Sequence, residues 1–241
     1  MGRLFAVVSG KGGVGKSSFC ITLARHLKNK GKVLLIDLDT GLSCLDLMLL
    51  VDDKVVFNLE DLVNKERDFK DVAIYAEQNL DLIAAPQNTL NKKALREFLF
   101  SITEEYDFVI VDFPAGKNTE LINAMPLYCE FLVVSCPDPV TLRDAEILSL
   151  SISDDYLSKR LVINNFILKN MQKGKLKRFS IDEMIDKSAL RLLGIIPYDK
   201  NIALLQSGKK LPKNTPANKA VFRISERILG RRMPLKKLKR I

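Results

Sequence analysis

Residues 9–18 of the chain read SGKGGVGKSS, and this stretch decides the fold. The spacing from Gly10 to Gly15, Lys16 and Ser17 matches a P-loop. In a P-loop, backbone N–H groups cradle phosphates, the lysine reaches the β/γ-phosphates and the hydroxyl binds Mg²⁺. A second lysine, Lys11, stands inside the loop, and the P-loop pattern alone gives it no role.

The segments on either side of this loop are the ones that a P-loop needs. Residues 4–8 (LFAVV) form a short apolar run typical of a buried parallel strand. Residues 17–30 carry apolar side chains at helical spacing, and Gly31 follows as a stop signal. The sequence therefore predicts a strand, a glycine-rich turn and a helix whose N-terminus faces the bound anion.

Short apolar runs alternate with helical patterns along the rest of the 241 residues. Alternation of this kind predicts an α/β fold with a mostly parallel, twisted sheet and helices on both faces. We expect one such domain over residues 1–230, with a last helix over 215–229. The expected strands after the first are 33–37, 80–84, 108–112, 131–135, 161–164 and 192–196.

Two aspartates stand at the ends of expected strands. Asp37 ends the run at 33–37, and Asp112 ends the run at 108–112. A single aspartate in such a place is most simply a helix cap. Two of them after a P-loop predict a shared Mg²⁺–phosphate site, because parallel strands bring their carboxyl ends to one edge of the sheet. Gly116, just after Asp112, suits a switch loop beside the γ-phosphate.

The composition argues against several other classes of protein. Cys20, Cys44, Cys129 and Cys136 are scattered, so neither a disulfide framework nor a zinc site is indicated, and we expect reduced, mostly buried cysteines in a cytosolic protein. His26, the only histidine, is expected on the surface, which argues against histidine-based catalysis. No signal-peptide pattern and no apolar run of about 20 residues occurs, so we expect a protein that is neither exported nor transmembrane.

Six stretches together resemble, in order and spacing, the deviant-Walker-A ATPases of the MinD/ParA group, which are P-loop NTPases of the SIMIBI type. The similarity covers nearly the whole chain and is strongest to the MinD branch. The stretches are KGGVGKSS (11–18), DLDTGLSCLDL (37–47), VDFPAG (111–116), PDPVTLRDAE (137–146), LVINNF (161–166) and LGIIPYDKNI (193–202).

The resemblance implies a role for each residue of an ATP·Mg²⁺ site. Lys11 is the signature lysine that crosses a dimer interface to the phosphates of the other subunit, and a cation supplied in this way stabilises the transferring phosphoryl group. Asp39 positions the attacking water, so the implied catalytic residues are Lys11, Lys16 and Asp39. Ser17, Asp37 and Asp112 serve the metal. The implied nucleotide contacts are Gly10, Lys11, Gly12, Gly13, Val14, Gly15, Lys16, Ser17, Ser18, Asn164, Pro197 and Asp199, with Asn165 as the neighbour that could replace Asn164.

The resemblance also implies a cellular role. It implies a slow ATPase that dimerises on ATP, binds the inner face of the cell membrane and positions cell division through a MinC-like inhibitor and a MinE-like activator. Arg143 and Asp144 lie in the stretch that resembles the partner-facing helix. Two alternatives remain: a ParA-like or flagellar-number-type positioning ATPase that uses nucleoid DNA or a protein anchor, and a nucleotide-binding adaptor with negligible turnover.

The end of the chain, residues 231–241 (RRMPLKKLKRI), holds six Lys/Arg and no acid. Without it the charge balance falls from +9 to 32 − 29 = +3, so the basicity belongs largely to this tail. On a helix, three aliphatic residues of the tail would share about 120° of arc, opposite the basic ones. This pattern predicts a short membrane-surface helix, although a solvated basic end or a nucleic-acid contact would carry the same charge. The membrane-contacting residues would be Leu235, Lys236, Lys237, Leu238, Lys239, Arg240 and Ile241.

Overall fold

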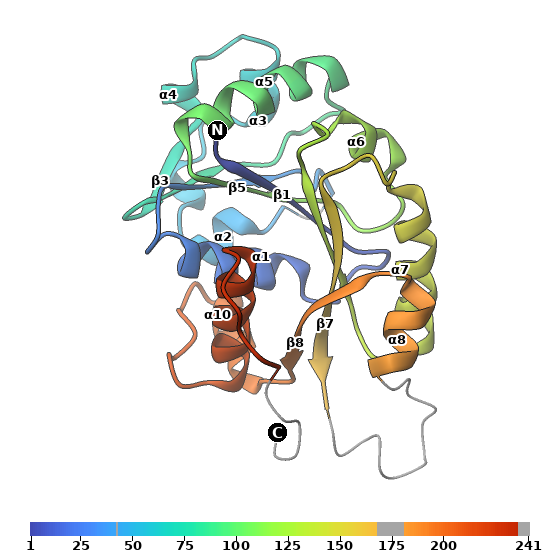
Figure 1. Ribbon diagram of the computed structural model, residues 1–241. Coiled ribbons are helices and arrows are strands. Elements are labelled where there is room, and N and C mark those ends of the chain that lie inside the picture. Colours follow the sequence, from blue (N-terminus) through green and yellow to red (C-terminus); the bar gives the residue numbers. More distant parts are fainter. Residues whose placement is uncertain (42, 168–180, 236–241) are drawn as a thin grey trace.

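The fold is taken from a computed structural model that describes residues 1–41, 43–167 and 181–235 (Figure 1). Residues 42, 168–180 and 236–241 lie outside the described part of the chain. The predicted tail helix therefore falls outside it, apart from Leu235, which is 53% exposed. The division into a domain over 1–230 and a tail over 231–241 stays a prediction.

The described residues form an eight-stranded sheet in the order β3-β4-β2-β5-β1-β6-β7-β8. Every neighbouring pair is parallel except β3 and β4, which confirms the predicted mostly parallel sheet. The strand β3, which the sequence did not predict, is four residues long at the edge of the sheet, too short for a clear apolar period. The strands are β1 (Arg3–Val8), β2 (Val33–Asp37), β3 (Ile74–Glu77), β4 (Leu80–Ile83), β5 (Phe108–Asp112), β6 (Glu130–Ser135), β7 (Ser158–Phe166) and β8 (Arg191–Pro197).

Helices cover both faces of the sheet, as predicted (Figure 1). One face packs against α1 (Lys16–Leu27), α2 (Leu45–Leu49), α9 (Ala203–Gln206) and α10 (Pro216–Ile228). The other face packs against α3 (Leu59–Val63), α4 (Phe69–Val72), α5 (Lys92–Glu105), α6 (Thr119–Ala124), α7 (Pro139–Ser151) and α8 (Ile181–Ser188). Two 3₁₀ turns, η1 (Asp52–Lys54) and η3 (Lys200–Ile202), complete the described elements.

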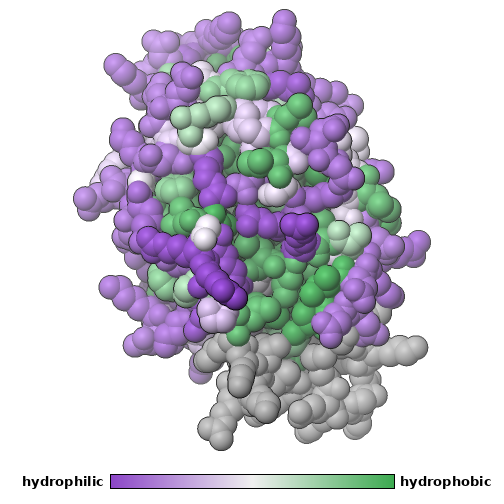
Figure 2. Space-filling model, in the orientation of Figure 1, coloured by the Kyte–Doolittle hydropathy of each residue, from purple (hydrophilic) through white to green (hydrophobic). Residues whose placement is uncertain are grey.

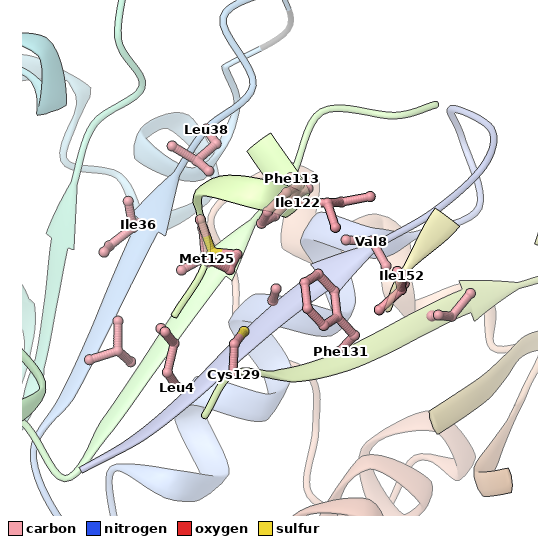
Figure 3. Close-up of a cluster of buried hydrophobic side chains, with 14 of the residues drawn as sticks. Leu4, Val8, Ile36, Leu38, Phe113, Ile122, Met125, Cys129, Phe131 and Ile152 are labelled. Atoms are coloured by element: carbon pink, nitrogen blue, oxygen red, sulfur yellow. The ribbon is translucent and has the colours of Figure 1, made fainter. Parts of the chain in front are cut away.

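Alternation along the central strands divides the interior into two cores. On β1, Leu4, Ala6 and Val8 face one core, whereas Phe5 and Val7 face the other. This alternation is the two-residue period of a strand that is buried on both faces. Figure 3 shows part of the first core, in which Phe131 and Phe113 lie near Leu4 and Val8 of β1. The two cores fix the central strands, and hence the edge of the sheet where β1 leads into α1.

The surface on the side seen in Figure 2 is mostly hydrophilic. Apolar side chains gather where Figure 1 places β7 and β8, above the atoms drawn in grey. Leu192 and Ile195 of β8 are only partly buried, as expected for a strand at the edge of the sheet. In the described part of the chain, no helix has the length and apolar character needed to cross a membrane.

Candidate nucleotide-binding site

The P-loop joins β1 to α1, the arrangement that the sequence predicted. Gly13 and Gly15 have positive φ values of 79° and 87°, a conformation that favours glycine. Gly15 is the residue before the first turn of α1, so the loop bends directly into a helix N-terminus. Lys11, Gly12 and Gly13 are exposed, whereas Lys16 is buried. The loop therefore places backbone N–H groups at a helix N-terminus, which suits a phosphate.

Asp37 and Asp112 lie side by side, because β2 and β5 are neighbours and these two residues are paired in register. Both side chains are buried, with 1% exposure each. The ammonium Nζ of Lys16 lies 2.6 Å from Oδ1 of Asp112. The sheet thus brings three of the predicted site residues together from positions far apart in the sequence.

The charges at this edge are unbalanced. Burial raises the pKa of Asp37 to about 7, and the nearby Asp112 carboxylate adds to the rise. Burial alone would lower the pKa of Lys16, but the Asp112 carboxylate outweighs that effect and raises it. One buried ammonium therefore faces two buried carboxyl groups. A divalent cation would relieve the repulsion between the carboxyl groups.

The segment after β2 folds back around Asp37. Its Oδ1 accepts a hydrogen bond from the N–H of Asp39 at 2.9 Å. Its Oδ2 accepts longer bonds from the N–H groups of Cys44 and Leu45, both at 3.4 Å. Asp39 itself is half-buried, and its Oδ1 accepts from the N–H of Gly41 at 3.2 Å. Asp37 thus organises the loop that carries the predicted water-positioning residue.

The segment after β5 also contacts the P-loop. The N–H of Gly116 donates to the carbonyl of Ser9 at 2.8 Å, and Gly116 has a φ of 100°. No heavy atom would crowd a side chain at Gly116, so the backbone conformation is what favours glycine there. The predicted switch loop is therefore tied to the first residue of the phosphate-binding stretch.

Asn164, at the end of β7, packs under the P-loop. Its Nδ2 donates to the carbonyl of Val14 at 2.7 Å, and a Cβ at Gly15 would overlap the same amide. Its Oδ1 is buried and has no hydrogen-bond partner among the described residues. Asn165 has a positive φ of 54° and turns its Nδ2 toward the sulfur of Cys136 instead. Of the two asparagines, Asn164 offers an unused acceptor beside the loop, which suits an adenine amino group.

Pro197 and Asp199 follow β8. Pro197 is the last residue of that strand and is buried. The carboxylate of Asp199 accepts hydrogen bonds from the N–H groups of Asn201 at 3.0 Å and Ala217 at 3.1 Å, so it caps η3 and the start of α10. Asp199 shapes the loop in this way, and its direct contact with a nucleotide stays a prediction.

The residues present fit a magnesium ion that the nucleotide brings with it. No group of three or more His, Cys, Asp or Glu side chains in the described part of the chain forms a metal site. Mg²⁺ is commonly held by one or two protein oxygens together with phosphates and water. The Ser17 hydroxyl at the start of α1 and the paired carboxyl groups of Asp37 and Asp112 supply such oxygens.

The structure adds contacts at the site that the sequence did not predict. The thiol of Cys20 lies near Asp112 and Lys16, and the thiol of Cys44 lies near Ser17, close enough to affect the pKa of each thiol. The position of Cys20, four residues after Lys16, places both on one face of the helix, which the sequence could have indicated. The expectation of mostly buried cysteines holds in part, since Cys20 and Cys129 are buried but Cys44 and Cys136 are only half-buried.

The helix α7 also contacts the P-loop. A Cβ at Gly10 would lie 2.5 Å from Cβ of Asp144, so glycine is needed for this close approach. Arg143, the neighbour of Asp144, is exposed. The two residues predicted to face a partner therefore differ: Arg143 points to the surface, and Asp144 packs on the loop.

The P-loop, the paired aspartates and the parallel sheet define a P-loop NTPase. The family described as "ParA: NUBPL iron-transfer P-loop NTPase" matches residues 1–229. The chain belongs to this ParA family, and within it to the MinD group of septum site-determining ATPases, which confirms the resemblance seen in the sequence. MinD of Synechocystis sp. is 30% identical over 212 residues, which cover 85% of this chain and 79% of that protein.

Solved structures show the same fold. MinD in the MinC:MinD cell division complex of Aquifex aeolicus superposes with a TM-score of 0.88 at 24% identity, covering 98% of both chains. MinD of Pyrococcus horikoshii, solved in complex with Mg-ADP, superposes with a TM-score of 0.80 at 24% identity, covering 95% of this chain and 96% of that one.

Proposed function

We propose that the chain is an ATPase of the MinD type that dimerises on Mg²⁺-ATP, attaches to the inner surface of the cell membrane and recruits regulators of the division site. The observation that carries this proposal is the edge of the sheet where Lys16, Asp37 and Asp112 meet, at the end of a loop that also carries the exposed Lys11. The first three residues suit Mg²⁺ and phosphates in one chain. The fourth suits a phosphate of a second chain.

Nucleotide binding follows from the P-loop geometry. The N–H groups of residues 10–18 and the ammonium of Lys16 would hold the phosphates, and the free Oδ1 of Asn164 would accept from the adenine amino group. Ser17, Asp37 and Asp112 would hold Mg²⁺, which neutralises charge on the phosphates. The Mg-ADP complex of the Pyrococcus protein supports this choice of ligand.

The exposure of Lys11 supports the role that the family resemblance implies for it. Its side chain lies at the surface of the loop, and no ion pair joins it to a described residue of its own chain. The γ-phosphate of a second subunit would neutralise it only in a face-to-face dimer, so ATP would hold the dimer together. Asp39 would orient the attacking water, and loss of the γ-phosphate would weaken the interface.

The first residues of the tail are hydrogen-bonded to the domain. This contact supports the proposal that the nucleotide bound by the domain controls membrane binding by the tail. The guanidinium of Arg227 donates to the carbonyl of Met233 at 2.8 Å and to that of Leu193 in β8 at 2.6 Å. The same strand ends at Pro197, in the loop predicted to lie beside the base. Two weak tails on one dimer would bind a membrane far better than one, through their effective concentration.

A partner surface on α7 is the second part of the proposal. Val140, Ile147 and Leu150 are exposed by 54%, 41% and 79%, and their spacing places them with Arg143 along one side of the helix. The complex that MinC forms with MinD in Aquifex aeolicus supports a MinC-like partner for this chain. A MinE-like activator of the slow hydrolysis would complete the cycle.

Co-sedimentation with vesicles that contain phosphatidylglycerol tests the proposal. The full chain should pellet more in Mg²⁺-ATP than in Mg²⁺-ADP, and a chain that ends after Met233 should lose this ATP-dependent difference. Replacing Leu235 and Leu238 with glutamine should reduce pelleting. Val56→Gln, which removes an apolar side chain 76% exposed elsewhere, is the matched control and should leave pelleting unchanged.

Failure to pellet in ATP, with dimers shown by analytical ultracentrifugation, would reject the tail anchor. Salt-sensitive, ATP-dependent binding to random-sequence DNA would then favour the ParA-like alternative.

A further inference from the structure

A second charged cluster lies at the far end of α1 from the P-loop. Arg25 and Lys28, in and just after the last turn of the helix, reach Glu77 at the end of β3. Arg25 Nε lies 2.9 Å from Oε1 of Glu77, and Lys28 Nζ lies 2.9 Å from Oε2. A third cation, Lys210, lies 2.8 Å from the same Oε2. One carboxylate thus gathers three cations from separate segments of the chain.

These residues line a cavity of about 180 Å³ between α1, β3, α9 and the start of α10. Its wall carries four cations, Arg25, Lys28, Lys210 and Lys213, against Glu77 alone. The formal charge of the lining is therefore +4 − 1 = +3. Clusters of like charge repel one another in a partly desolvated site, so the cavity favours an anion.

Arg25 supplies a second observation, which is independent of the net charge of the cavity. Its side chain is only 12% exposed, and its Nη1 is buried without a hydrogen-bond partner among the described residues. A buried guanidinium N–H without an acceptor is costly, and such groups are nearly always satisfied in native proteins. Arg25 thus lines the cavity while one of its guanidinium nitrogens lacks an acceptor, which adds to the excess of donors there.

The remaining wall supplies polar contacts. His26 was expected on the surface, but it is half-buried, and its Nε2 lies 2.6 Å from Oδ1 of Asn218. Because Nδ2 of Asn218 donates to the carbonyls of Leu211 and Pro212, its Oδ1 is the acceptor and His26 Nε2 is the donor. These bonds tie the loop that carries Lys210 and Lys213 to α10, so the cations are held around the cavity.

From this geometry we propose that the cavity between α1, β3 and α10 binds a phosphate group, with Arg25, Lys28, Lys210 and Lys213 as its cationic contacts. Phosphate is the oxyanion that a guanidinium and several ammonium groups match best. The cavity volume is about six times the roughly 30 Å³ that a water molecule takes up in the liquid, which leaves room for a phosphate and its hydration. The site is separate from the P-loop, since nine helical residues from Lys16 to Arg25 span roughly 14 Å.

His26 makes the test specific because it is the only histidine of the chain, so its ring protons give a single set of NMR signals. The full chain is loaded with saturating Mg²⁺-ADP to occupy the P-loop. Inorganic phosphate is then added at constant ionic strength, with chloride as the balancing anion. The His26 signals should shift and saturate.

Two exposed lysines provide the matched variants. Lys213→Gln removes a cation of the cavity that has no ion pair in the described chain, so the fold should be kept. It should weaken the apparent affinity for phosphate at least fivefold. Lys219→Gln removes an exposed lysine of α10 outside the cavity and should leave the affinity unchanged. A shift that does not saturate, or equal affinities in both variants, would overturn the proposal.

A second arm identifies where the phosphate comes from. The chain that ends after Met233 is sedimented with phosphatidylglycerol vesicles. Pelleting that Lys213→Gln removes assigns the cavity to a lipid headgroup, whereas saturable NMR shifts without pelleting assign it to a soluble phosphate. Both results are independent of ATP, so this proposal and the proposed function succeed or fail separately.

Discussion

The two ends of α1 carry charge clusters of opposite balance. At its N-terminus, Lys16 faces two buried acids, Asp37 and Asp112. At its C-terminal end, the single acid Glu77 faces Arg25, Lys28 and Lys210. The difference shows in the acids themselves: the pKa of Asp37 is raised to about 7, and that of Glu77 is lowered to about 2. The excess of acidic groups at the N-terminal end favours binding of a cation such as Mg²⁺, and the excess of basic groups at the C-terminal end favours binding of an anion.

The largest expected effect comes from the lysine at the acidic end. Lys16→Ala should lower ATP turnover about 100- to 1000-fold, because it removes a cation aimed at the transferring phosphate. Lys30→Ala, just beyond the other end of α1 and outside the cavity, should leave turnover unchanged, since its ion pair with Glu226 at 3.8 Å lies away from the P-loop. Steady-state phosphate release measures both variants. Equal losses would show that charge along the whole helix, rather than the site at its N-terminus, drives the reaction.

The raised pKa of Asp37 predicts that the nucleotide-free protein loses stability as the pH rises. Its folded pKa of about 7 exceeds the unfolded value near 4, so the folded state binds the extra proton between these limits. The contribution to stability is full below about pH 4 and is lost as the pH rises through 7, by up to about 4 kcal/mol. Urea unfolding of Asp37→Asn should lack this loss. The same slope in wild type and variant would refute the assignment.

Two glycines of the P-loop, Gly13 and Gly15, test the backbone conformation and packing at the acidic end of α1. Gly15→Ala should reduce stability by about 1–3 kcal/mol, because the new Cβ combines a positive φ with overlap of the Asn164 amide. Gly13→Ala carries the positive φ alone, with open space around it, and should cost about 1 kcal/mol. Thermal unfolding measures the difference. If Gly13→Ala proves the more damaging, the packing of Asn164 under the loop is wrong.

The smallest effect is expected at the basic end. Burial alone would raise the pKa of Glu77, but hydrogen bonds from Lys210, Lys28 and Arg25 outweigh it. The lowered pKa means that stability is present above the unfolded pKa near 4 and is lost as the pH falls toward 2. Glu77→Gln should therefore cost about 1–2 kcal/mol at pH 7, allowing for solvent screening, and almost nothing at pH 2. A variant equally destabilised at both pH values would rule out a charge effect.

The sequence predicted the acidic end far better than the basic one. Strand, glycine-rich loop and helix are contiguous, and Asp37 and Asp112 end apolar runs that a parallel sheet must bring to one edge. The strands at 33–37 and 108–112 have the predicted bounds, and others differ by a few residues at their ends. Most of this prediction therefore rests on the local spacing of apolar residues.

The basic end could not be predicted because it depends on contacts between distant segments. Glu77 lies on β3, an edge strand that the sequence did not show, and Lys210 and Lys213 lie in a loop without apolar periodicity. Asp199 shows the same limit, since its bonds from the N–H groups of Asn201 and Ala217 make it a cap, which the sequence did not indicate. Side-chain partners of this kind follow from tertiary packing rather than from local pattern.

The central claim is that Lys11 acts on the nucleotide of a second subunit, and subunit mixing tests it most directly. Lys11→Ala and Asp39→Ala should each lose ATP turnover. In a mixed dimer, one site combines the intact Asp39 of one chain with the intact Lys11 of the other. An equimolar mixture should therefore recover up to about a quarter of wild-type turnover, because half of the dimers are mixed and each has one intact site. A mixture no more active than the mean of the two variants would contradict the claim.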